Sequence, residues 1–292
     1  MLFDFLLLAM TGVTKFPELQ KFTSFIFTYI AASTISLIHD WSGIILILLI
    51  IIHLILNFRI ISRNKNKKLR QLNKKTTIVL TSLIVIILAI FTASFIWTNQ
   101  PIKLNSVEVK SYKGEKLGSI NDFRENSIKG PQYIDKNKYR LKITGLVGKE
   151  TNYSYDDVLK LQKYQKVVQL NCVEGWSVKV LWEGVLVKDL FKNLSVSPKA
   201  NTIIFYAADG YSTSFPLDYV MNNNIMMAYK MNNVTLPPER GFPFQLVAEQ
   251  KWGYKWIKWI TKIELSDNTN YQGYWEQRGY NNNGDLNGSK FQ

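Results

Sequence analysis

The chain has 292 residues, which leaves room for one large domain or two smaller ones. Its formal net charge of +14 is typical of nucleic-acid-binding proteins, but outside one short loop the basic residues are diffuse and form no basic face with stacking aromatic residues. We therefore expect no nucleic-acid partner. The single cysteine, Cys172, excludes an intramolecular disulfide.

Two apolar runs in the first hundred residues are long enough to cross a membrane. No charged side chain occurs from Trp41 to Phe58 or from Thr76 to Trp97. The second run would be about 33 Å long as a helix, against a hydrocarbon core of about 30 Å. Residues 59–75 between the runs carry eight basic and no acidic side chains, which indicates a cytoplasmic loop. Everything after Thr98 is then expected outside the cell membrane.

A further span upstream has two candidates, residues 2–13 and residues 22–38. One crossing there places the N-terminus inside, and two place it outside. The first apolar stretch lacks a basic leader, so we expect no separate cleavable signal peptide. Residues 1–98 are accordingly predicted to form a multi-pass helical anchor in contact with membrane lipid.

The only histidines, His39 and His53, both lie near or within the predicted span of residues 41–58. This segment resembles small cytochrome-b-like membrane anchors, and intramembrane histidines are functional candidates. Their spacing corresponds to about 21 Å along a helix, so both cannot ligate one haem. Haem b would need a second subunit, a homodimer or another ligand such as Met10. The alternative places His39 at the interface and hydrogen-bonds His53 to a neighbouring helix.

The rest of the chain has the pattern of an α+β domain. Residues 99–130 are polar and mixed, typical of a linker and the start of the domain, and residues 131–292 form the domain itself. Strands are predicted over residues 139–145, 167–170, 202–206 and 257–265. Ser154 and Asp157 predict a capped short helix, and another follows Val185. The Asn/Gly-rich end after Tyr280 lacks an apolar period and is expected to be loose.

Six short motifs in the predicted domain carry the chemical information. They are Gln169–Ser177, Trp182–Val185, Asp209–Tyr211, Glu239–Val247, Trp252–Ile260 and Gly273–Glu276. In this order and at these distances they resemble the molybdopterin-binding domain of the sulfite oxidase and methionine-sulfoxide reductase superfamily, over about residues 120–280. The resemblance implies a mixed-sheet, barrel-like catalytic fold and a Mo-molybdopterin cofactor.

The resemblance makes Cys172 the single protein ligand of molybdenum. A thiolate is a soft, strongly donating ligand, which suits such a metal; the alternative is a structural core cysteine. Glu174 matches an acidic residue beside the metal, where it could relay protons. Asp209 and Tyr211 match a segment near the pocket mouth. They could equally be structural, with Asp209 capping a turn and Tyr211 packing its ring.

The family's pterin ends in a phosphate, which needs cations and backbone donors. Lys258 matches a position that contacts this phosphate, Trp256 and Ile257 flank it, and Lys255 is a nearby candidate. The alternative is that both lysines only cover the solvent face of the last strand.

The sequence also departs from the family pattern near this phosphate site. Gln245 stands where relatives usually have arginine, and Arg240 stands where the reductase branch has asparagine. In one interpretation, Arg240 supplies the positive charge that relatives have at position 245, five residues later in the chain.

Together these features predict a membrane-anchored molybdenum-cofactor oxidoreductase. It would act on a small molecule by oxygen-atom transfer or a related two-electron step and exchange electrons with quinone or haem in the membrane. The alternative is a catalytically inert membrane receptor or assembly factor on the same fold.

Overall fold

The computed structural model describes residues 102–123 and 125–292, together with residues 5, 6, 9, 39, 41–47, 49–51, 53 and 82. The chain divides into two compact units, one with residues 1–16 and 34–101 and the other with residues 17–33 and 102–292. The described residues of the first unit are helical. The spans considered above, residues 2–13, 22–38, 41–58 and 76–97, lie wholly or partly outside the described residues. Among the residues that are described, no helix has the length and apolar character to cross a bilayer.

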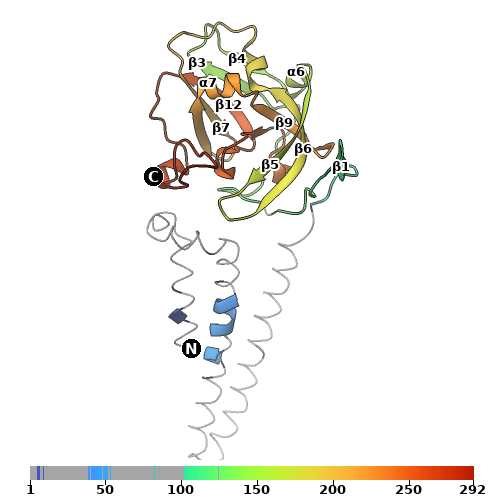
Figure 1. Ribbon diagram of the computed structural model, residues 1–292, viewed down its shortest axis with the longest axis vertical. Helices are drawn as coiled ribbons and strands as arrows, with labels where there is room; N and C mark the ends of the chain where they lie inside the picture. The colour runs from blue at the N-terminus through green and yellow to red at the C-terminus, as the bar shows by residue number, and fades with distance from the viewer. Residues whose placement is uncertain are drawn as a thin grey trace, which may run out of the picture. The chain divides into compact units, whose positions relative to one another are not determined.

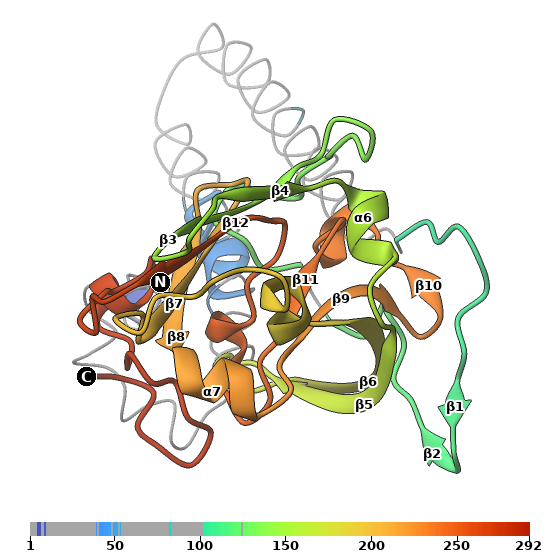
Figure 2. The same ribbon diagram turned by 90° about the horizontal axis from the view of Figure 1, so that it is seen from above.

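Residues 102–292 fold around two sheets of five strands each, which lie on different sides of the domain (Figure 1, Figure 2). The first sheet is antiparallel. Its strands in spatial order are β10 (Val234–Thr235), β9 (Met226–Met231), β6 (Ser177–Leu186) and β5 (Tyr164–Asn171), with β11 (Gln245–Val247) also paired to β9. A separate hairpin of β1 (Ser111–Tyr112) and β2 (Glu115–Lys116) projects from the domain (Figure 2).

The second sheet is mixed, because β3 and β12 run parallel while its other neighbours are antiparallel. Its strands in spatial order are β4 (Thr151–Tyr153), β3 (Leu141–Gly145), β12 (Ile260–Ser266), β7 (Thr202–Ala207) and β8 (Ser212–Pro216). The mixed sheet expected from the sequence is therefore confirmed.

Helices are short in the described domain, which is sheet-rich. Its α-helices are α6 (Tyr155–Leu159) and α7 (Leu217–Asn222). Its 3-10 helices are η1 (Val187–Phe191), η2 (Pro238–Arg240), η3 (Gly253–Lys255) and η4 (Glu276–Arg278).

Local sequence explains where the first elements form. In β3, Leu141 and Ile143 are buried while Lys142 between them is exposed, which is the period-2 pattern of a half-buried strand. Helix α6 begins after Ser154, whose hydroxyl accepts the backbone N–H of Asp157, while the Asp157 carboxylate accepts the backbone N–H of Ser154. This reciprocal pair satisfies two donors that the helix itself cannot satisfy.

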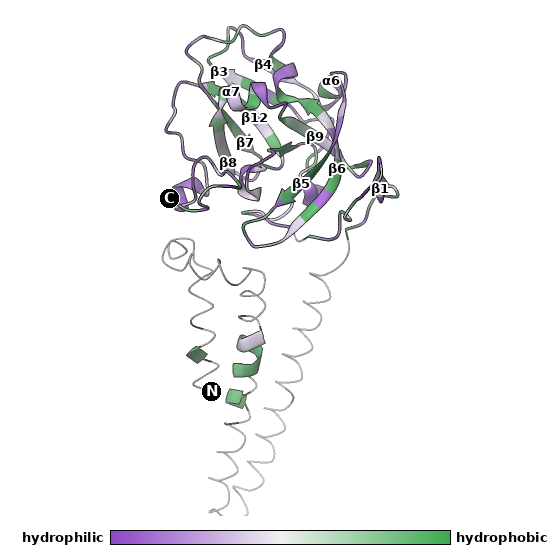
Figure 3. Ribbon diagram, viewed as in Figure 1, coloured by the Kyte–Doolittle hydropathy of each residue, from purple (hydrophilic) through white to green (hydrophobic). Residues whose placement is uncertain are grey.

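The core lies between the sheets and is built from large apolar side chains. Figure 3 shows hydrophobic residues on the strands and mostly hydrophilic residues in the connecting loops. Trp182 on β6, Phe205 on β7 and Phe244 before β11 are among the largest fully buried side chains. Burying such a side chain stabilises the fold by about 1.5–3 kcal/mol, and tight packing then holds the loops at the strand ends.

The last strand begins later than its alternation predicts. The prediction placed it over residues 257–265, but β12 starts at Ile260 because Trp259 has a φ of +52°, which extended backbone does not adopt. The register with β7 also shifts between Ile260 and Lys262. Ile260 is therefore buried rather than on the polar side.

The expectation of a loose end after Tyr280 is wrong. The backbone of Asn281 donates to Lys290, and Gln292 donates to Gly279, so the tail folds back on itself. The backbone N–H of Trp252 donates to Gly284 O at 2.8 Å, and this hydrogen bond attaches the tail to the rest of the domain. The partners in each of these hydrogen bonds are not close neighbours in sequence, so the local pattern of hydrophobic residues does not predict the contacts.

Candidate functional site

The turn that carries Cys172 joins β5 to β6. Cys172 N donates to Trp176 O at 2.9 Å, and Gly175 N donates to Cys172 O at 3.1 Å. Gly175 has a φ of +88°, a conformation that glycine adopts without steric cost. The hairpin therefore places the cysteine directly after the last residue of β5, at the strand-to-turn junction expected from the sequence.

The thiol of Cys172 is free and only 8% exposed. Asn126 Nδ2 lies 3.8 Å from its Sγ. Burial, and then the nearby charge of Glu174, raise the pKa of Cys172 to about 12. In the protein alone the thiol is therefore protonated at neutral pH, and only a bound cation or metal would hold it as the thiolate.

Glu174 lies in the same turn and is half-buried. Its Oε2 accepts the indole N–H of Trp176 at 3.2 Å, and the Trp176 ring stacks on Phe123 with centroids 5.3 Å apart. This contact orients the carboxylate two residues from Cys172, close enough for its charge to act on the thiol.

Arg240, at the end of η2, is buried and contacts Ile120 and Phe123 of the segment formed by residues 120–123, 125 and 126. Its Nε and Nη2 donate to Ile120 O at 3.0 and 2.9 Å, and Nη2 also donates to Phe123 O. The guanidinium carbon lies 3.9 Å from the centre of the Phe123 ring. Burial lowers the pKa of Arg240 to about 10. Arg240 thus holds the segment that reaches Cys172 through Asn126.

Lys258 lies under the same segment. Its Nζ is 2.5 Å from Glu125 Oε1 and 3.5 Å from Glu239 O, and its side chain is 15% exposed. A Cβ added to Gly241 would lie 3.0 Å from Lys258 Cβ, so the glycine lets the two segments approach closely. Burial lowers the pKa of Lys258, although Glu125 opposes this shift. Lys258 is therefore a largely buried cation paired with one carboxylate.

Asp209 and Tyr211 lie in the turn between β7 and β8. Asp209 Oδ1 accepts the backbone N–H of Tyr211 at 2.9 Å, and Tyr211 donates its hydroxyl to Tyr254 O. Burial raises the pKa of Tyr211 well above its usual value. These contacts match the structural interpretation of both residues, with Asp209 capping the turn and Tyr211 packing its ring.

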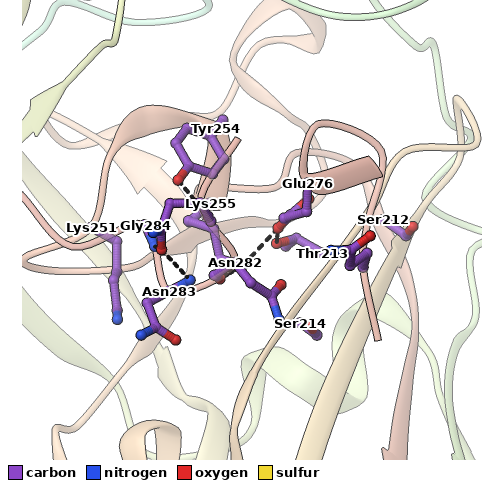
Figure 4. A network of polar contacts seen from close by, with 12 residues as sticks. Ser212, Thr213, Ser214, Lys251, Tyr254, Lys255, Glu276, Asn282, Asn283 and Gly284 are labelled. Atoms are coloured by element: carbon purple, nitrogen blue, oxygen red, sulfur yellow. Dashed lines mark hydrogen bonds and ion pairs between the residues drawn. The ribbon is translucent and has the colours of Figure 1, made fainter. Parts of the chain in front are cut away.

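Lys255 lies in a network of polar contacts with Glu276 and Asn282 (Figure 4). Its side chain is fully buried, and Nζ lies 2.7 Å from Glu276 Oε1 and 2.8 Å from Asn282 O. Thr213 donates to the same carboxylate oxygen at 2.7 Å. Burial lowers the pKa of Lys255 more than Glu276 raises it. Lys255 therefore ties the C-terminal tail to the sheet and does not lie on a solvent face.

Three other predicted cofactor contacts are buried in the domain. Trp256 donates its indole N–H to Lys251 O at 3.0 Å, Ile257 belongs to the core, and Gln245 lies in β11. Their side chains pack inside the domain around the site and are not exposed on its surface.

The fold thus brings Cys172 and Glu174 together in one turn. The segment formed by residues 120–123, 125 and 126 contacts Cys172, Arg240 and Lys258. Sequence reasoning missed this connecting segment, including Glu125 and Asn126, because it lacks an apolar period and was assigned to a linker. Ile120 is fully buried, and this tertiary packing holds the segment against the domain. His39 and His53 are helical residues of the first unit, and haem ligation by them stays a prediction. In the described part of the chain, no group of three or more His, Cys, Asp or Glu side chains could hold a metal ion.

Comparison with known proteins assigns the domain to a family. The family model "Oxidoreductase molybdopterin binding domain" matches residues 128–275. The chain is 33% identical over 156 residues to the uncharacterized oxidoreductase YuiH of Bacillus subtilis, covering 53% of this chain and 78% of YuiH. It is 30% identical over 147 residues to the protein-methionine-sulfoxide reductase catalytic subunit MsrP of Gluconobacter oxydans, covering 44% of this chain and about half, 47%, of that relative.

Among solved structures, the sulfane dehydrogenase SoxCD of Paracoccus pantotrophus has a TM-score of 0.47 and 24% identity, covering 51% of this chain and 42% of that one. The family match spans the Cys172 turn, Arg240 and Lys258 together. The chain belongs to the family of oxidoreductases with a molybdopterin-binding domain.

Proposed function

We propose that the protein is a membrane-anchored molybdenum-cofactor oxidoreductase in which Cys172 is the protein ligand of the metal. The observation that carries this proposal is the position of Cys172, a free and buried thiol at the end of β5 within the matched domain. A thiolate donates strongly to a metal whose other ligands are sulfur atoms. When bound, the cofactor supplies two-electron oxygen-atom-transfer chemistry.

The residues around Cys172 fit an anionic, sulfur-ligated group. Trp252 Nε1 is buried without a hydrogen-bond partner in the described part of the chain. The next residue, Gly253, packs against the turn, since a Cβ added there would lie 3.4 Å from Cys172 Cα. A buried donor without a partner is costly, which favours a hydrogen-bond-accepting group bound beside it.

The remaining roles follow from charge. Lys258 contacts the pterin phosphate in this proposal, because it is a cation whose present partner, Glu125, is a carboxylate that the phosphate can replace. Glu174 holds or delivers a proton beside the metal. Arg240 acts indirectly, by holding the backbone at Ile120 and Phe123 beside the site.

The substrate class is suggested by relatives such as MsrP, which is named as a protein-methionine-sulfoxide reductase. Reduction of a sulfoxide to a thioether consumes two electrons and two protons and releases one water molecule. In this proposal, electrons from quinone or haem in the membrane supply the reducing equivalents, and Glu174 passes the protons.

Membrane anchoring is supported by the first unit. Among its described helical residues, Trp41, Ile45, Ile47 and Ile50 are large, apolar and exposed. Exposed apolar side chains in one short stretch are typical of a surface that contacts lipid or another protein. With the basic loop of residues 59–75, this favours a cell-membrane protein whose catalytic domain is extracytoplasmic.

The test is to purify the full-length protein in detergent and measure molybdenum and pterin per chain. We expect both groups in the protein, and oxidation of a reduced dye that depends on methionine sulfoxide. A visible absorption spectrum of the same sample shows whether haem b is bound, which is required if His39 and His53 are haem ligands. Absence of molybdenum and pterin would favour the inert receptor or assembly factor instead.

A further inference from the structure

The segment of residues 250–255 packs against the backbone of the turn that carries Cys172. A Cβ added to Gly253 would lie 3.2 Å from Asn171 O and 3.4 Å from Cys172 Cα, which is tighter than most Cβ contacts. Gly253 does not have a positive φ, so its backbone conformation does not require glycine. What this position requires is space, because the missing side chain lets the two backbones approach closely.

The C-terminal tail, residues 279–292, holds the same segment in place. All residues of the segment other than Gly253 take part in hydrogen bonds or an ion pair with the tail, while Gly253 packs on the Cys172 turn. These contacts are Trp252 N to Gly284 O at 2.8 Å, Leu286 N to Gln250 O at 2.9 Å, Tyr254 Oη to Asn281 O at 2.7 Å, Lys255 Nζ to Asn282 O at 2.8 Å and Lys251 Nζ to Asp285 Oδ1 at 2.6 Å.

The short helix η3 links the tail to the Cys172 turn. It runs from Gly253 to Lys255, and Lys255 N donates to Trp252 O at 2.9 Å. The Lys255 side chain is 0% exposed and pairs with Glu276 at 2.7 Å. The tail also packs on its aliphatic part, since a Cβ added to Gly284 would lie 2.6 Å from Lys255 Cγ. Because close packing transmits displacements, a shift of Lys255 reaches Gly253 two residues away.

We propose that Gly253 and Lys255 are positioning residues of the Cys172 turn. The tail holds Lys255 and with it η3, and Gly253 sets where the cysteine backbone lies. The consequence for a bound metal rests on the proposed function, whereas the packing does not. Groups that support a metal ligand set its direction toward the metal, so a change in this support should alter the electronic state of the metal. The segment also carries Trp252, whose buried indole N–H has no partner in the described part of the chain.

The first experiment measures access to Cys172 in the full-length chain, produced in cells that cannot make the pterin. Cys172 is the only cysteine and is 8% exposed, so alkylation of the native protein by iodoacetamide reports on this turn alone. Gly253→Ala adds one methyl group, and the neighbouring backbone must shift by a few tenths of an ångström. We expect alkylation to become about three- to tenfold faster, because the turn opens more easily.

Lys255→Met, which releases the tail from η3, should increase the alkylation rate in the same direction. If this variant does not fold, Gly253→Ala decides alone, because it leaves the buried Lys255–Glu276 pair intact. An unchanged rate in Gly253→Ala would overturn the proposal.

Two controls separate positioning from a general loss of stability. Gly288→Ala adds the same methyl group within the tail, where a Cβ would lie 3.5 Å from Asp285 O in ordinary contact, and it should leave the rate unchanged. Ile143→Val removes a buried methyl group from β3 and lowers the free energy of unfolding without touching the turn, so it should also leave the rate unchanged. An equal increase in Ile143→Val and Gly253→Ala would refute the positioning role.

The second experiment uses the holoprotein and records the electron paramagnetic resonance signal of the partly reduced metal, together with molybdenum per chain. Gly253→Ala should shift this signal at unchanged molybdenum content, because the direction of the cysteine sulfur changes. Gly288→Ala should give the wild-type signal. A wild-type signal in Gly253→Ala contradicts the proposal, since a purely structural role would change stability and not the signal. If the wild-type protein carries no molybdenum, the proposed function fails, while the alkylation rates still decide the roles of Gly253 and Lys255.

Discussion

Lys258 Nζ and Glu125 Oε1 are 2.5 Å apart, although the two residues are separated by 133 positions in the chain. The lysine that we propose as the contact of the cofactor phosphate is therefore already paired with a carboxylate. A phosphate and Glu125 would compete for one cation, and this competition can be measured.

Lys258→Ala should weaken cofactor retention. It removes a charge-assisted contact of about 1.5–3 kcal/mol, which corresponds to about ten- to a hundredfold in affinity. Lys262→Ala is the matched control, because Lys262 lies on β12, is paired with Glu264 at 2.9 Å, and should cost within about 0.5 kcal/mol. Molybdenum and pterin per chain are measured after extended dialysis. Equal occupancy in both variants would mean that Lys258 does not hold the phosphate.

Glu125→Gln distinguishes two roles of the Glu125 carboxylate. It either competes with the phosphate for Lys258 or forms part of the cofactor-binding site. If Glu125 only occupies Lys258 until the phosphate arrives, the variant should retain cofactor at least as well as the wild type. A loss as large as that of Lys258→Ala would instead make Glu125 part of the binding site.

Cys172→Ser should abolish turnover while leaving the fold intact. An alcohol is a poor replacement for a thiolate ligand, whereas the two side chains have similar size. Circular dichroism checks the fold and metal analysis checks occupancy. Substantial activity at normal molybdenum content in this variant would disprove the assignment of Cys172 as the ligand.

The features predicted from the sequence are those that depend on local pattern. Leu141 and Ile143 alternate with polar neighbours, and they form β3 as expected. Ser154 and Asp157 lie three residues apart, and they form the predicted capping box. Such features need only neighbours within a few residues.

The features that were missed depend on partners far away in the chain. The tail after Tyr280 has no apolar period, yet Lys255 binds Asn282 O and holds it in place. Ile120 is fully buried, and its carbonyl oxygen accepts hydrogen bonds from Arg240, which lies 120 residues away in the chain. Neither contact can be recognised from local composition. The packing of these two segments near the candidate site therefore could not be predicted from the sequence.

The proposed extracytoplasmic orientation of the domain rests on the basic residues of the loop 59–75. Protease added to intact cells whose outer envelope has been removed should cut beyond Thr98, because that part is expected outside. Protection of this part, together with cleavage within residues 59–75, would reverse the topology.

Alkaline pH should destabilise the domain through Tyr139. Its hydroxyl is buried and donates to Ile260 O at 2.5 Å, and burial raises its pKa well above 10.0. The unfolded phenol loses its proton near pH 10 while the folded one keeps it, so stability present below pH 10 is lost as pH rises. Tyr139→Phe should reduce this decline by up to about 1.4 kcal/mol per pH unit.

The control for this decline is Tyr133→Phe, since Tyr133 is 78% exposed. Urea unfolding at pH 9, 10 and 11 measures the dependence. Equal slopes in the wild type and Tyr139→Phe would exclude Tyr139 as a source of alkaline instability.

The buried pair of Lys255 and Glu276 should show strong energetic coupling. Both side chains are 0% exposed, and Glu276 Oε2 has no partner in the described part of the chain. Lys255→Met would leave an uncompensated carboxylate and should lower the free energy of unfolding by about 3–5 kcal/mol. Lys255→Met combined with Glu276→Leu should cost less than the sum of the single changes, because no buried charge is then left alone. Urea unfolding of the wild type, both single variants and the double variant measures this. Additive losses would mean that the pair contributes only packing, and that the tail is held by its backbone hydrogen bonds instead.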